Sequence, residues 1–282
     1  MRIDNLAAVV VVYNPDFQVV ENIRTYISYF YKTFIVDNSD KVTVNFKEYF
    51  PDDSVEYIRF NENLGIAVAL NKALYLENKC EYLLTMDQDS FFSNNMIKKY
   101  INHMMHIKQY GENIALISAN WEKEHDEKVM FVEECITSGN FVNIEIAKKI
   151  GGFCEKLFID EVDYDFCNRL RACRYNILKF NDVFMQHSIG NPSRYNFFGF
   201  TFIVTNHSPF RIYYIVRNKL YMIKKYPSLK FNYVWMFIKK WIKIFLFEKE
   251  KILKVYMGIL GVKDFMNNKY GKFENINYYE KV

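Results

Sequence analysis

The sequence has little of what a membrane-spanning, secreted or nucleic-acid-binding protein needs. None of its 282 residues belongs to a run of about 18 apolar residues, so no membrane-spanning helix is predicted. A charged Asp4 stands where a signal peptide would need apolar residues. The formal net charge is only +4 and no long basic run occurs, which argues against a nucleic-acid partner. These absences predict a cytoplasmic protein.

Cysteine, glycine and proline are scarce as well. The five cysteines form no C-x-x-C pair and have no zinc-finger spacing, so we expect buried free thiols in a reducing compartment. Aromatic residues are abundant at 18%, and half of the residues are hydrophobic. This is enough apolar material for one large α/β domain with an extension.

Strand and helix patterns alternate through the first 120 residues. Strands are predicted at 6–12, 34–36, 55–59, 82–86 and 114–119, with helices at about 17–30, 63–78 and 95–110. The first strand is a continuous apolar run, as expected for a strand buried on both faces of a parallel sheet. The alternation predicts a doubly wound α/β fold, whose ligands bind where the strands end. Beyond residue 120 we expect short strands, a small helix near 144–150, and a helical region from about 211.

The sharpest motif is Asp87-Gln88-Asp89-Ser90, which follows the fourth strand. Two carboxylates one residue apart at a strand end can both reach a hard cation such as Mg²⁺ or Mn²⁺ and its coordinated diphosphate. The alternative is a solvated turn that caps the next helix, because D-x-D often occurs by chance. A haloacid-dehalogenase phosphatase is a weaker alternative, since its D-x-D normally follows the first strand.

Four acids lie close together at Asp160, Glu161, Asp163 and Asp165, at the start of a predicted helix. Acids favour the first turn of a helix, and Asp165 is one turn from Arg169, which explains one or two of them. Four such acids between apolar residues leave some poorly compensated. Repulsion and partial burial would raise the basicity of one carboxylate, as a general base needs.

Glycine-containing segments and one histidine complete the candidates. Asn63-Leu64-Gly65 opens a helix whose positive end favours anions, although, taken alone, the segment is better explained by a tight helix–sheet contact. Gly139 and the Gly151-Gly152 pair are expected to be turn residues first and substrate loops second. His187 is expected to be structural unless it reaches a cation held by Asp89.

Seven segments, in order, resemble glycosyltransferase family 2, in particular its rhamnosyltransferase-like branch. They are Val11 to Pro15, Val36 to Ser39, Asn63 to Asn71, Asp87 to Ser90, Asp163 to Arg169, His187 to Gly190, and Arg211 to Asn218. The resemblance implies a GT-A fold with a Rossmann-like, mostly parallel sheet. It also implies a catalytic domain at 1–210, with a nucleotide-binding half (1–120) and an acceptor half (121–210), and a helical extension at 211–282.

The resemblance implies a role for each candidate residue. Asp163 is the expected catalytic base, although Val162 stands where much of the family has Glu. Asp89 and His187 are the expected metal ligands. The expected nucleotide-sugar contacts are Tyr13, Asn14, Asp37, Asn63, Gly65, Asp87, Arg211 and Arg217. The expected acceptor or surrounding residues are Asp160, Glu161, Asp165 and Gly139.

The implied reaction is an inverting transfer that needs Mg²⁺ or Mn²⁺. The first candidate donor is dTDP-L-rhamnose, and a UDP-hexose or UDP-galactofuranose is the alternative. The implied acceptor is a glycan, free or linked to polyprenyl diphosphate, in bacterial O-antigen or capsule synthesis. From another class, a non-catalytic scaffold that binds sugar nucleotides stays open, and so does a homodimer.

The stretch 231–247 is rich in aromatic residues and lysine. On a helical wheel Asn232, Lys239, Lys240 and Lys243 form one basic stripe beside apolar residues. Such a helix suits the interface of an anionic membrane, at which the protein would be peripheral. A helix packed on the catalytic domain or in a dimer interface, with lysines that extend to solvent, is the equal alternative.

Overall fold

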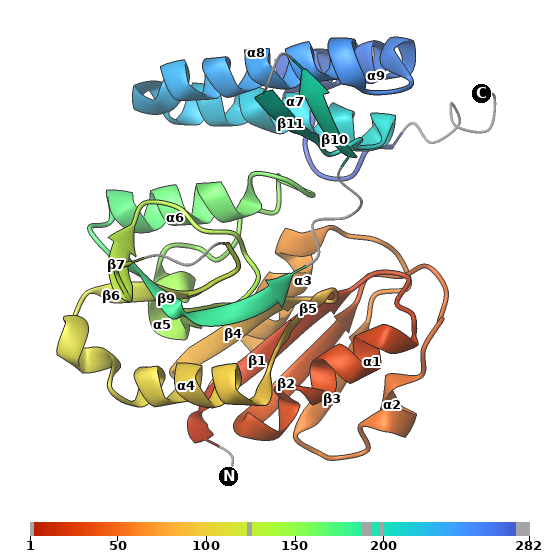
Figure 1. The fold of residues 1–282 in the computed structure, drawn as a ribbon. Helices are drawn as coiled ribbons and strands as arrows, with labels where there is room; N and C mark the ends of the chain where they lie inside the picture. Colours follow the sequence, from red (N-terminus) through yellow and green to blue (C-terminus); the bar gives the residue numbers. More distant parts are fainter. Residues whose placement is uncertain (1–2, 123–125, 188–192, 198–199, 275–282) are drawn as a thin grey trace. The chain divides into compact units, whose positions relative to one another are not determined.

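The first half of the chain forms the parallel part of a mixed sheet. The computed structural model describes residues 3–122, 126–187, 193–197 and 200–274. Four neighbouring strands pair in parallel in the order β3-β2-β1-β4. Their bounds are β1 Ile3–Val12, β2 Phe30–Asp37, β3 Val55–Arg59 and β4 Tyr82–Asp87. All four end at the same edge of the sheet (Figure 1).

The second half extends this sheet with strands of both directions. The order continues β4-β8-β6-β9-β5, and β7 also pairs with β9. β8 is antiparallel to both neighbours, whereas β6 and β9 are parallel. Their bounds are β5 Ser90–Phe92, β6 Ile114–Asn120, β7 Val129–Val132, β8 Asn140–Asn143 and β9 Asn176–His187. The predicted α/β fold, with a mostly parallel sheet and flanking helices, is thereby confirmed.

Both faces of the central strands are buried, as the apolar run of the first strand predicted. Ala8 and Val10 belong to the core cluster that α1 and α4 cover, while Ala7 and Val9 point to the opposite face and are 0% exposed. Helix α3 packs on β1 and β2. Because neither face meets water there, β1 consists only of apolar residues from Leu6 to Val12.

The helices of this part of the chain include several short ones. They are α1 Phe17–Arg24, α2 Phe46–Tyr49, α3 Ile66–Leu76, α4 Asn94–Met105, α5 Ile144–Lys149 and α6 Val162–Ala172, with 3₁₀ turns at Ile27–Tyr29 and Ile107–Tyr110. The prediction of one helix over 17–30 was wrong. Helix α1 ends at Arg24, where the Thr25 hydroxyl donates to the Asn22 carbonyl, and Phe30 already belongs to β2.

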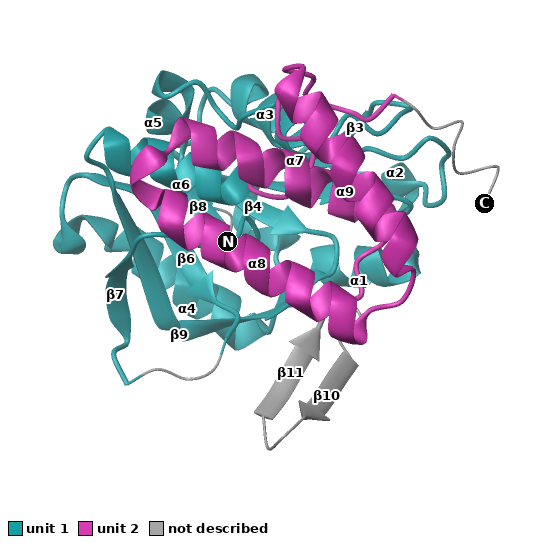
Figure 2. Ribbon diagram, turned by 90° about the horizontal axis from the view of Figure 1, so that it is seen from above, with its two compact units in different colours: residues 1–155, 162–188 teal, residues 156–161, 189–282 magenta. Residues whose placement is uncertain are grey.

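The chain divides into two compact units (Figure 2). Unit 1 contains residues 1–155 and 162–188, and unit 2 contains 156–161 and 189–282. Compactness thus groups 189–210 with the C-terminal helices, whereas the sequence analysis placed that segment in the acceptor half. The functional boundary at residue 210 stays a prediction.

Unit 2 has a strand pair and three long helices. The antiparallel strands are β10 Ser193–Phe197 and β11 Phe200–Val204. The helices are α7 Pro209–Lys225, α8 Lys230–Phe247 and α9 Lys251–Met266, with a 3₁₀ turn at Pro227–Leu229. The predicted helical extension is therefore present. In the described part of the chain, no helix combines the length and apolar character needed to cross a bilayer.

Helix α7 is the packing centre of unit 2. Val216 and Ile212 share a buried cluster with Ile244 of α8, and Tyr213 shares another with Met257 of α9. Gly261 of α9 approaches so closely that a Cβ there would lie 2.6 Å from the Tyr213 carbonyl oxygen. The helices therefore form one packed layer of their own.

The predicted basic stripe on α8 is wrong at Lys240. This side chain turns inward, and its Nζ lies 3.2 Å from Oε1 of Glu248, the residue that follows α8. Glu248 also accepts from Lys254 of α9 at 2.7 Å. A helical wheel shows only the directions of side chains within one helix. It therefore cannot show that Glu248, which lies beyond the end of α8, pairs with Lys240.

Candidate functional site

The candidate site starts at the carboxyl ends of three adjacent parallel strands. In the strand register Val12 lies beside Asp37, and Val11 lies beside Asp87. Asp37 is 1% exposed: Oδ1 accepts the Ser39 N–H at 2.8 Å, and Oδ2 accepts the Tyr57 hydroxyl at 2.6 Å. Burial, and next the hydrogen bond to Asp37, raise the pKa of Tyr57. The carboxylate therefore organises the turn after β2, and its contact with a base or ribose stays a prediction.

Gln88 fastens the turn after β1 to the end of β4. Its Oε1 accepts the Tyr13 N–H at 2.7 Å, and its Nε2 donates to the Tyr13 carbonyl at 3.2 Å. Asn22 donates to the Gln88 carbonyl at 2.8 Å, and Asn14 N–H donates to the Ser39 hydroxyl at 2.7 Å. The Tyr13 ring remains 46% exposed. The middle residue of the D-x-D motif thus fixes the backbone of the first loop, a role that the sequence analysis missed.

The Asn63-Leu64-Gly65 segment is attached to the end of β2. Asn63 Oδ1 accepts the Gly65 N–H at 3.0 Å, and the Asn38 side chain bonds both Leu64 N–H and the Gly65 carbonyl. Gly65 has φ +92°, a left-handed conformation that glycine adopts without a Cβ penalty, and it precedes α3. The N-terminus of α3 therefore faces the same strand ends.

Asn71, the last residue of that motif, holds a distant turn. Its Oδ1 accepts the Phe153 N–H at 2.7 Å, and its Nδ2 donates to the Phe153 carbonyl at 2.9 Å. Gly152 has φ +67°, and a Cβ there would lie 2.5 Å from Asn71 Oδ1. The glycine pair singled out in the sequence is therefore a close-approach turn on α3.

Asp87, Asp89 and His187 form one acidic cluster. Each offers a ligand atom, and these three atoms all lie within 4.8 Å of one another. The cluster arises because β5 pairs antiparallel with β9, which sets Ser90 opposite His187. His187 Nδ1 lies 2.7 Å from the Ser90 hydroxyl oxygen and 3.4 Å from Asp89 Oδ1. The rest of the H-x-x-G segment, 188–190, lies outside the described residues.

The electrostatics of the cluster favour a cation. The hydrogen bond with Asp89 raises the pKa of His187, and the charges of Asp89 and Asp87 add to this, against a lowering by burial. Two carboxylates with an imidazole are a donor set that divalent cations accept, and Asp89 is 43% exposed, so a cation has access. The residues present therefore fit the predicted divalent metal. Ser90, which contacts the imidazole, is 0% exposed.

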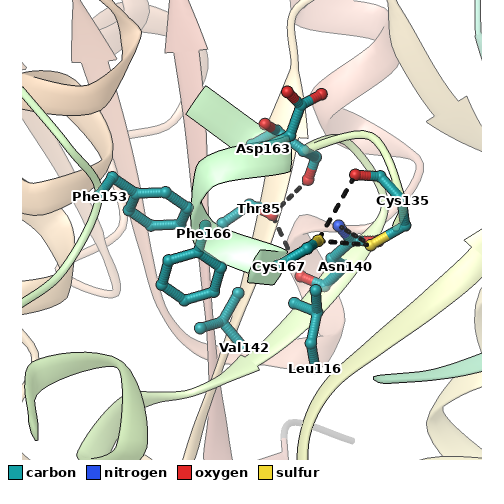
Figure 3. Close-up of a pocket in the computed structure, with 10 residues that line it drawn as sticks. Thr85, Leu116, Cys135, Asn140, Val142, Phe153, Asp163, Phe166 and Cys167 are labelled. Carbon is teal, nitrogen blue, oxygen red and sulfur yellow. Dashed lines mark hydrogen bonds between the residues drawn. The ribbon is translucent and has the colours of Figure 1, made fainter. Parts of the chain in front are cut away.

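Asp163 and Asp165 lie in the first turn of α6 but have different surroundings. Asp165 is 0% exposed, and its Oδ2 accepts from Arg169 Nε at 2.8 Å, as predicted. Asp163 is half-buried and lines a pocket of about 10 Å³ with Thr85 and Asn140 (Figure 3). This volume is room for about one water and none for a sugar. Figure 3 shows the Asp163 carboxylate pointing away from the Phe166 ring.

Gly139 has a structural reason to be glycine. It has φ +78°, and a Cβ there would lie 2.6 Å from Met185 Sδ. Its N–H donates to the Thr85 carbonyl at 2.8 Å, and the neighbouring Ser138 hydroxyl accepts the Asp87 N–H at 3.0 Å. The loop before β8 thus supports the D-x-D backbone, and a contact of Gly139 with an acceptor stays a prediction.

Asp160 and Glu161 belong to unit 2, apart from the other two acids. Arg211 of α7 donates to both Asp160 oxygens, with Nη2 at 2.9 Å from Oδ1. Lys219 of α7 pairs with Glu161 at 2.5 Å, and both side chains are buried. Both acids have positive φ, +62° and +65°. These contacts anchor the segment before α6 to α7.

Arg217 is enclosed within unit 2. It is 1% exposed and lies 5.0 Å from the centre of the Tyr214 ring and 5.2 Å from that of Tyr213. Its Nη1 donates to the Gly271 carbonyl at 2.8 Å. Arg217 therefore holds the chain after α9, and its predicted contact with a diphosphate has no support in these contacts.

Comparison with known proteins gives one family. The model of glycosyl transferase family 2 matches residues 8–166. The dTDP-rhamnosyl transferase RfbF of Shigella flexneri is 31% identical over 253 residues, which cover 78% of this chain and 80% of RfbF.

Two solved structures share the fold. GalNAc-T7 with UDP, GalNAc and Mn²⁺ has a TM-score of 0.56 at 12% identity, over 76% of this chain and 47% of that one. TarS of S. aureus has a TM-score of 0.51 at 13% identity, over 97% of this chain and 44% of that one. The chain spans less than half the length of either. The family match, the RfbF identity and the sheet together lead to one conclusion: this chain belongs to glycosyltransferase family 2 and is a glycosyltransferase of GT-A fold, similar to rhamnosyltransferases.

Proposed function

We propose that the protein is an inverting, metal-dependent transferase that moves a sugar from a nucleoside-diphosphate donor to a glycan acceptor. The observation that carries the proposal is the Asp87–Asp89–His187 cluster, which lies at the carboxyl end of β4. Ligands of an open α/β sheet bind at that edge. The first loop, with the exposed Tyr13 ring, lies beside it through Gln88.

The proposed donor site extends from the cluster along the sheet edge. Asp87 and Asp89 with His187 would hold Mg²⁺ or Mn²⁺, and the structure of GalNAc-T7, which has a similar fold, contains UDP and Mn²⁺. When bound, the cation supplies positive charge to the departing diphosphate. Tyr13, Asn14 and Asp37 would surround the nucleoside. Asn63 and Gly65 would present the α3 N-terminus, which favours anions.

Asp163 is the proposed general base. It would accept the proton of the acceptor hydroxyl while that oxygen attacks the anomeric carbon, opposite to the diphosphate. A positioned base contributes about 10²–10⁴-fold to the rate. Its half-buried position and the direction of its carboxylate away from the core support this role, whereas Asp165 is committed to Arg169.

The remaining candidate residues are proposed to act around the acceptor and the diphosphate. Asp160, Glu161, Asp165 and Gly139 would shape the acceptor side through the backbone that they fix. Arg211 pairs with Asp160, so we rank it below the metal ligands as a contact of the diphosphate. Arg217 is buried and fully engaged, so we rank it last.

The proposed substrates come from the relative's name and the family resemblance. RfbF is named a dTDP-rhamnosyl transferase, which makes dTDP-L-rhamnose the first donor to test. A UDP-hexose or UDP-galactofuranose is the alternative. We propose a glycan of bacterial surface polysaccharide, free or carried on polyprenyl diphosphate, as acceptor.

Thermal unfolding with a panel of nucleotides tests this proposal. Purified protein is heated with dTDP, UDP or GDP, or the matching sugar nucleotides, each with Mg²⁺, Mn²⁺ or EDTA. A ligand of the native state raises the melting temperature. We expect a metal-dependent rise that is largest with dTDP-rhamnose. A larger rise in melting temperature with UDP-sugars would make a UDP-sugar the proposed donor. No rise with any nucleotide would contradict a nucleotide-sugar site and favour the scaffold alternative.

A further inference from the structure

Helix α8 has one buried face and one exposed apolar face. Its buried residues Tyr233 and Ile244 are 5% and 0% exposed. The outer face comprises Phe231, Val234, Trp235, Ile238, Ile242 and Phe245, whose spacing of three and four residues places them on one side of the helix. We call these six residues the α8 outer face.

The α8 outer face exposes large side chains to a degree that is unusual for a folded surface. Phe231 is 83% exposed, Phe245 54% and Trp235 51%. Leu246, next to this face, is 61% exposed, and Ile252 at the start of α9 is 88% exposed. Contiguous apolar patches of this kind mark interaction sites rather than ordinary surface.

The charge around this face is basic. Residues 230–266 contain eight lysines and three acids, a net charge of +5 in a chain whose total is +4, so the rest of the chain carries −1. Helix α8 has no acidic residue. Glu248, one of the three acids, is enclosed between Lys240 and Lys254 and presents no charge to solvent.

Two lysines flank the apolar residues directly. Lys239 is exposed, and its Nζ lies 5.0 Å from the centre of the Trp235 ring. Lys243 follows one turn later on the same side of the helix. Aromatic and aliphatic residues beside lysines are the composition by which a helix lies in the boundary between headgroups and acyl chains.

We propose that the α8 outer face binds the surface of an anionic lipid bilayer, with the helix lying in the plane of the interface. The apolar residues would enter the acyl boundary, and Lys239 and Lys243 would meet the lipid phosphates. No donor, acceptor or catalytic residue enters this argument, so it stands apart from the proposed function.

A second copy of the chain is the less favoured occupant. Two outer faces in contact would bring the same basic flanks together, and like charges in an interface disfavour association. An anionic bilayer offers both an apolar interior and opposite charge. The same positive potential would draw the protein to the surface from within about 8 Å at physiological salt.

Vesicle co-sedimentation tests the proposal. Full-length protein is mixed with vesicles of phosphatidylcholine alone or with phosphatidylglycerol, at low and high salt. The outer-face variant is Ile238→Glu with Ile242→Glu, and its matched control is Met105→Glu, at an exposed apolar side chain of α4. The charge variant is Lys239→Gln with Lys243→Gln, and its control is Lys47→Gln with Lys98→Gln, at exposed lysines of unit 1. Circular dichroism and thermal unfolding check that each variant remains folded.

We expect wild type and both controls to bind the anionic vesicles and to be released by high salt. Each lysine near an anionic surface contributes about fivefold to binding, so the charge variant should bind about 25-fold more weakly. The outer-face variant should bind at least about tenfold more weakly, because two carboxylates replace apolar side chains that would enter the bilayer. Tryptophan fluorescence, to which Trp235 contributes together with Trp121 and Trp241, should shift to the blue when the wild type binds.

Three results would overturn the proposal. One is no binding of the wild type to anionic vesicles. Another is an outer-face variant that is folded and binds as wild type does. The third is a wild-type dimer in sedimentation velocity that the outer-face variant abolishes while vesicle binding is absent, which would assign the face to a second copy.

Discussion

Asp163 and Asp165 lie two residues apart in the first turn of α6, yet we expect their amide variants to fail in different ways. The Asp165 carboxylate is 0% exposed and accepts from Arg169 Nε at 2.8 Å, and Arg169 Nη1 also donates to the Ile150 carbonyl. Asp165→Asn removes the charge that this largely buried guanidinium faces. Removing one partner of a buried pair costs about 3–5 kcal/mol, and the amide oxygen that remains puts the expected loss near the lower end, about 3 kcal/mol.

Asp163→Asn should leave stability almost unchanged. The Asp163 Oδ1 accepts the Tyr164 N–H at 3.0 Å, and the amide oxygen of the variant can accept the same bond. Substitutions outside the core usually change the unfolding free energy by about 0.5 kcal/mol or less. If Asp163 is the base, the rate of transfer should fall by about 10²–10⁴-fold, because an amide does not take up the proton.

The assay pairs urea unfolding with transfer from the donor that the nucleotide panel identifies. Donor binding by Asp163→Asn, measured by calorimetry, should be close to wild type. Asp163→Asn with near wild-type transfer would refute the base assignment. An Asp165→Asn variant that is as stable as wild type but inactive would assign the role of base to Asp165.

Three further predictions concern the packing around the site and in unit 2. Asn71→Ala should lower the unfolding free energy by about 2–4 kcal/mol, because the buried N–H and C=O of Phe153 lose their partners; a loss in urea unfolding below about 1 kcal/mol would contradict this. Gly152→Ala should lower the unfolding free energy by about 1–2 kcal/mol because of its positive φ alone. In the wild-type background the loss should be larger, because the new Cβ also meets Asn71 Oδ1, an atom that the Asn71→Ala background lacks. A double-mutant cycle that shows no coupling between the two substitutions would contradict this contact. Glu248→Gln should cost about 3–5 kcal/mol at neutral pH, because it leaves Lys254, 2% exposed, without its carboxylate. Burial alone raises the pKa of Glu248, but the hydrogen bond from Lys254 and the charge of Lys240 outweigh it, so the folded-state pKa lies below the unfolded one. This stabilisation is therefore present above the unfolded pKa and is lost as the pH falls through the folded-state pKa, so the difference between wild type and Glu248→Gln should shrink in acid.

The parallel strands could be predicted because their signal is local. Residues 55–59 were predicted as a strand and form β3 with the same bounds. The first strand was predicted from its apolar run and is buried along most of its length. Long stretches of β1 and β4 are buried on both faces, so their apolar composition marks them as strands within a short window of the sequence.

The error at 17–30 shows where local pattern is insufficient. The apolar residues of 27–30 fit a helix face or a strand equally well. Phe30 is 0% exposed, and its ring lies 6.0 Å from that of Phe141, more than a hundred residues away. Phe30 also pairs with Ile3 of β1, and no short window of the sequence contains either of these contacts.

The candidate site could be predicted from the sequence only where its residues are neighbours in the chain. Asp87 and Asp89 are neighbours in sequence, so the motif was visible. His187 joins them through the β5–β9 pairing, which places it beside Ser90, 97 residues earlier in the chain. The sequence could name His187 only as a conditional candidate, and the resemblance made it an expected ligand. The sequence analysis assigned no role to Gln88, because its two bonds to the Tyr13 backbone depend on the parallel register of β1 and β4.

The central claim is that Asp87, Asp89 and His187 hold a divalent cation through which the donor diphosphate binds. Titration calorimetry of dTDP or UDP, whichever stabilises the protein more, into wild type and Asp89→Ala, each with Mn²⁺ or EDTA, tests it most directly. Asp53→Asn, at an exposed acid before β3, is the control. We predict that EDTA and Asp89→Ala each abolish measurable binding, while the control binds as wild type does. Binding of equal affinity in Asp89→Ala, or in wild type with EDTA, would contradict the account.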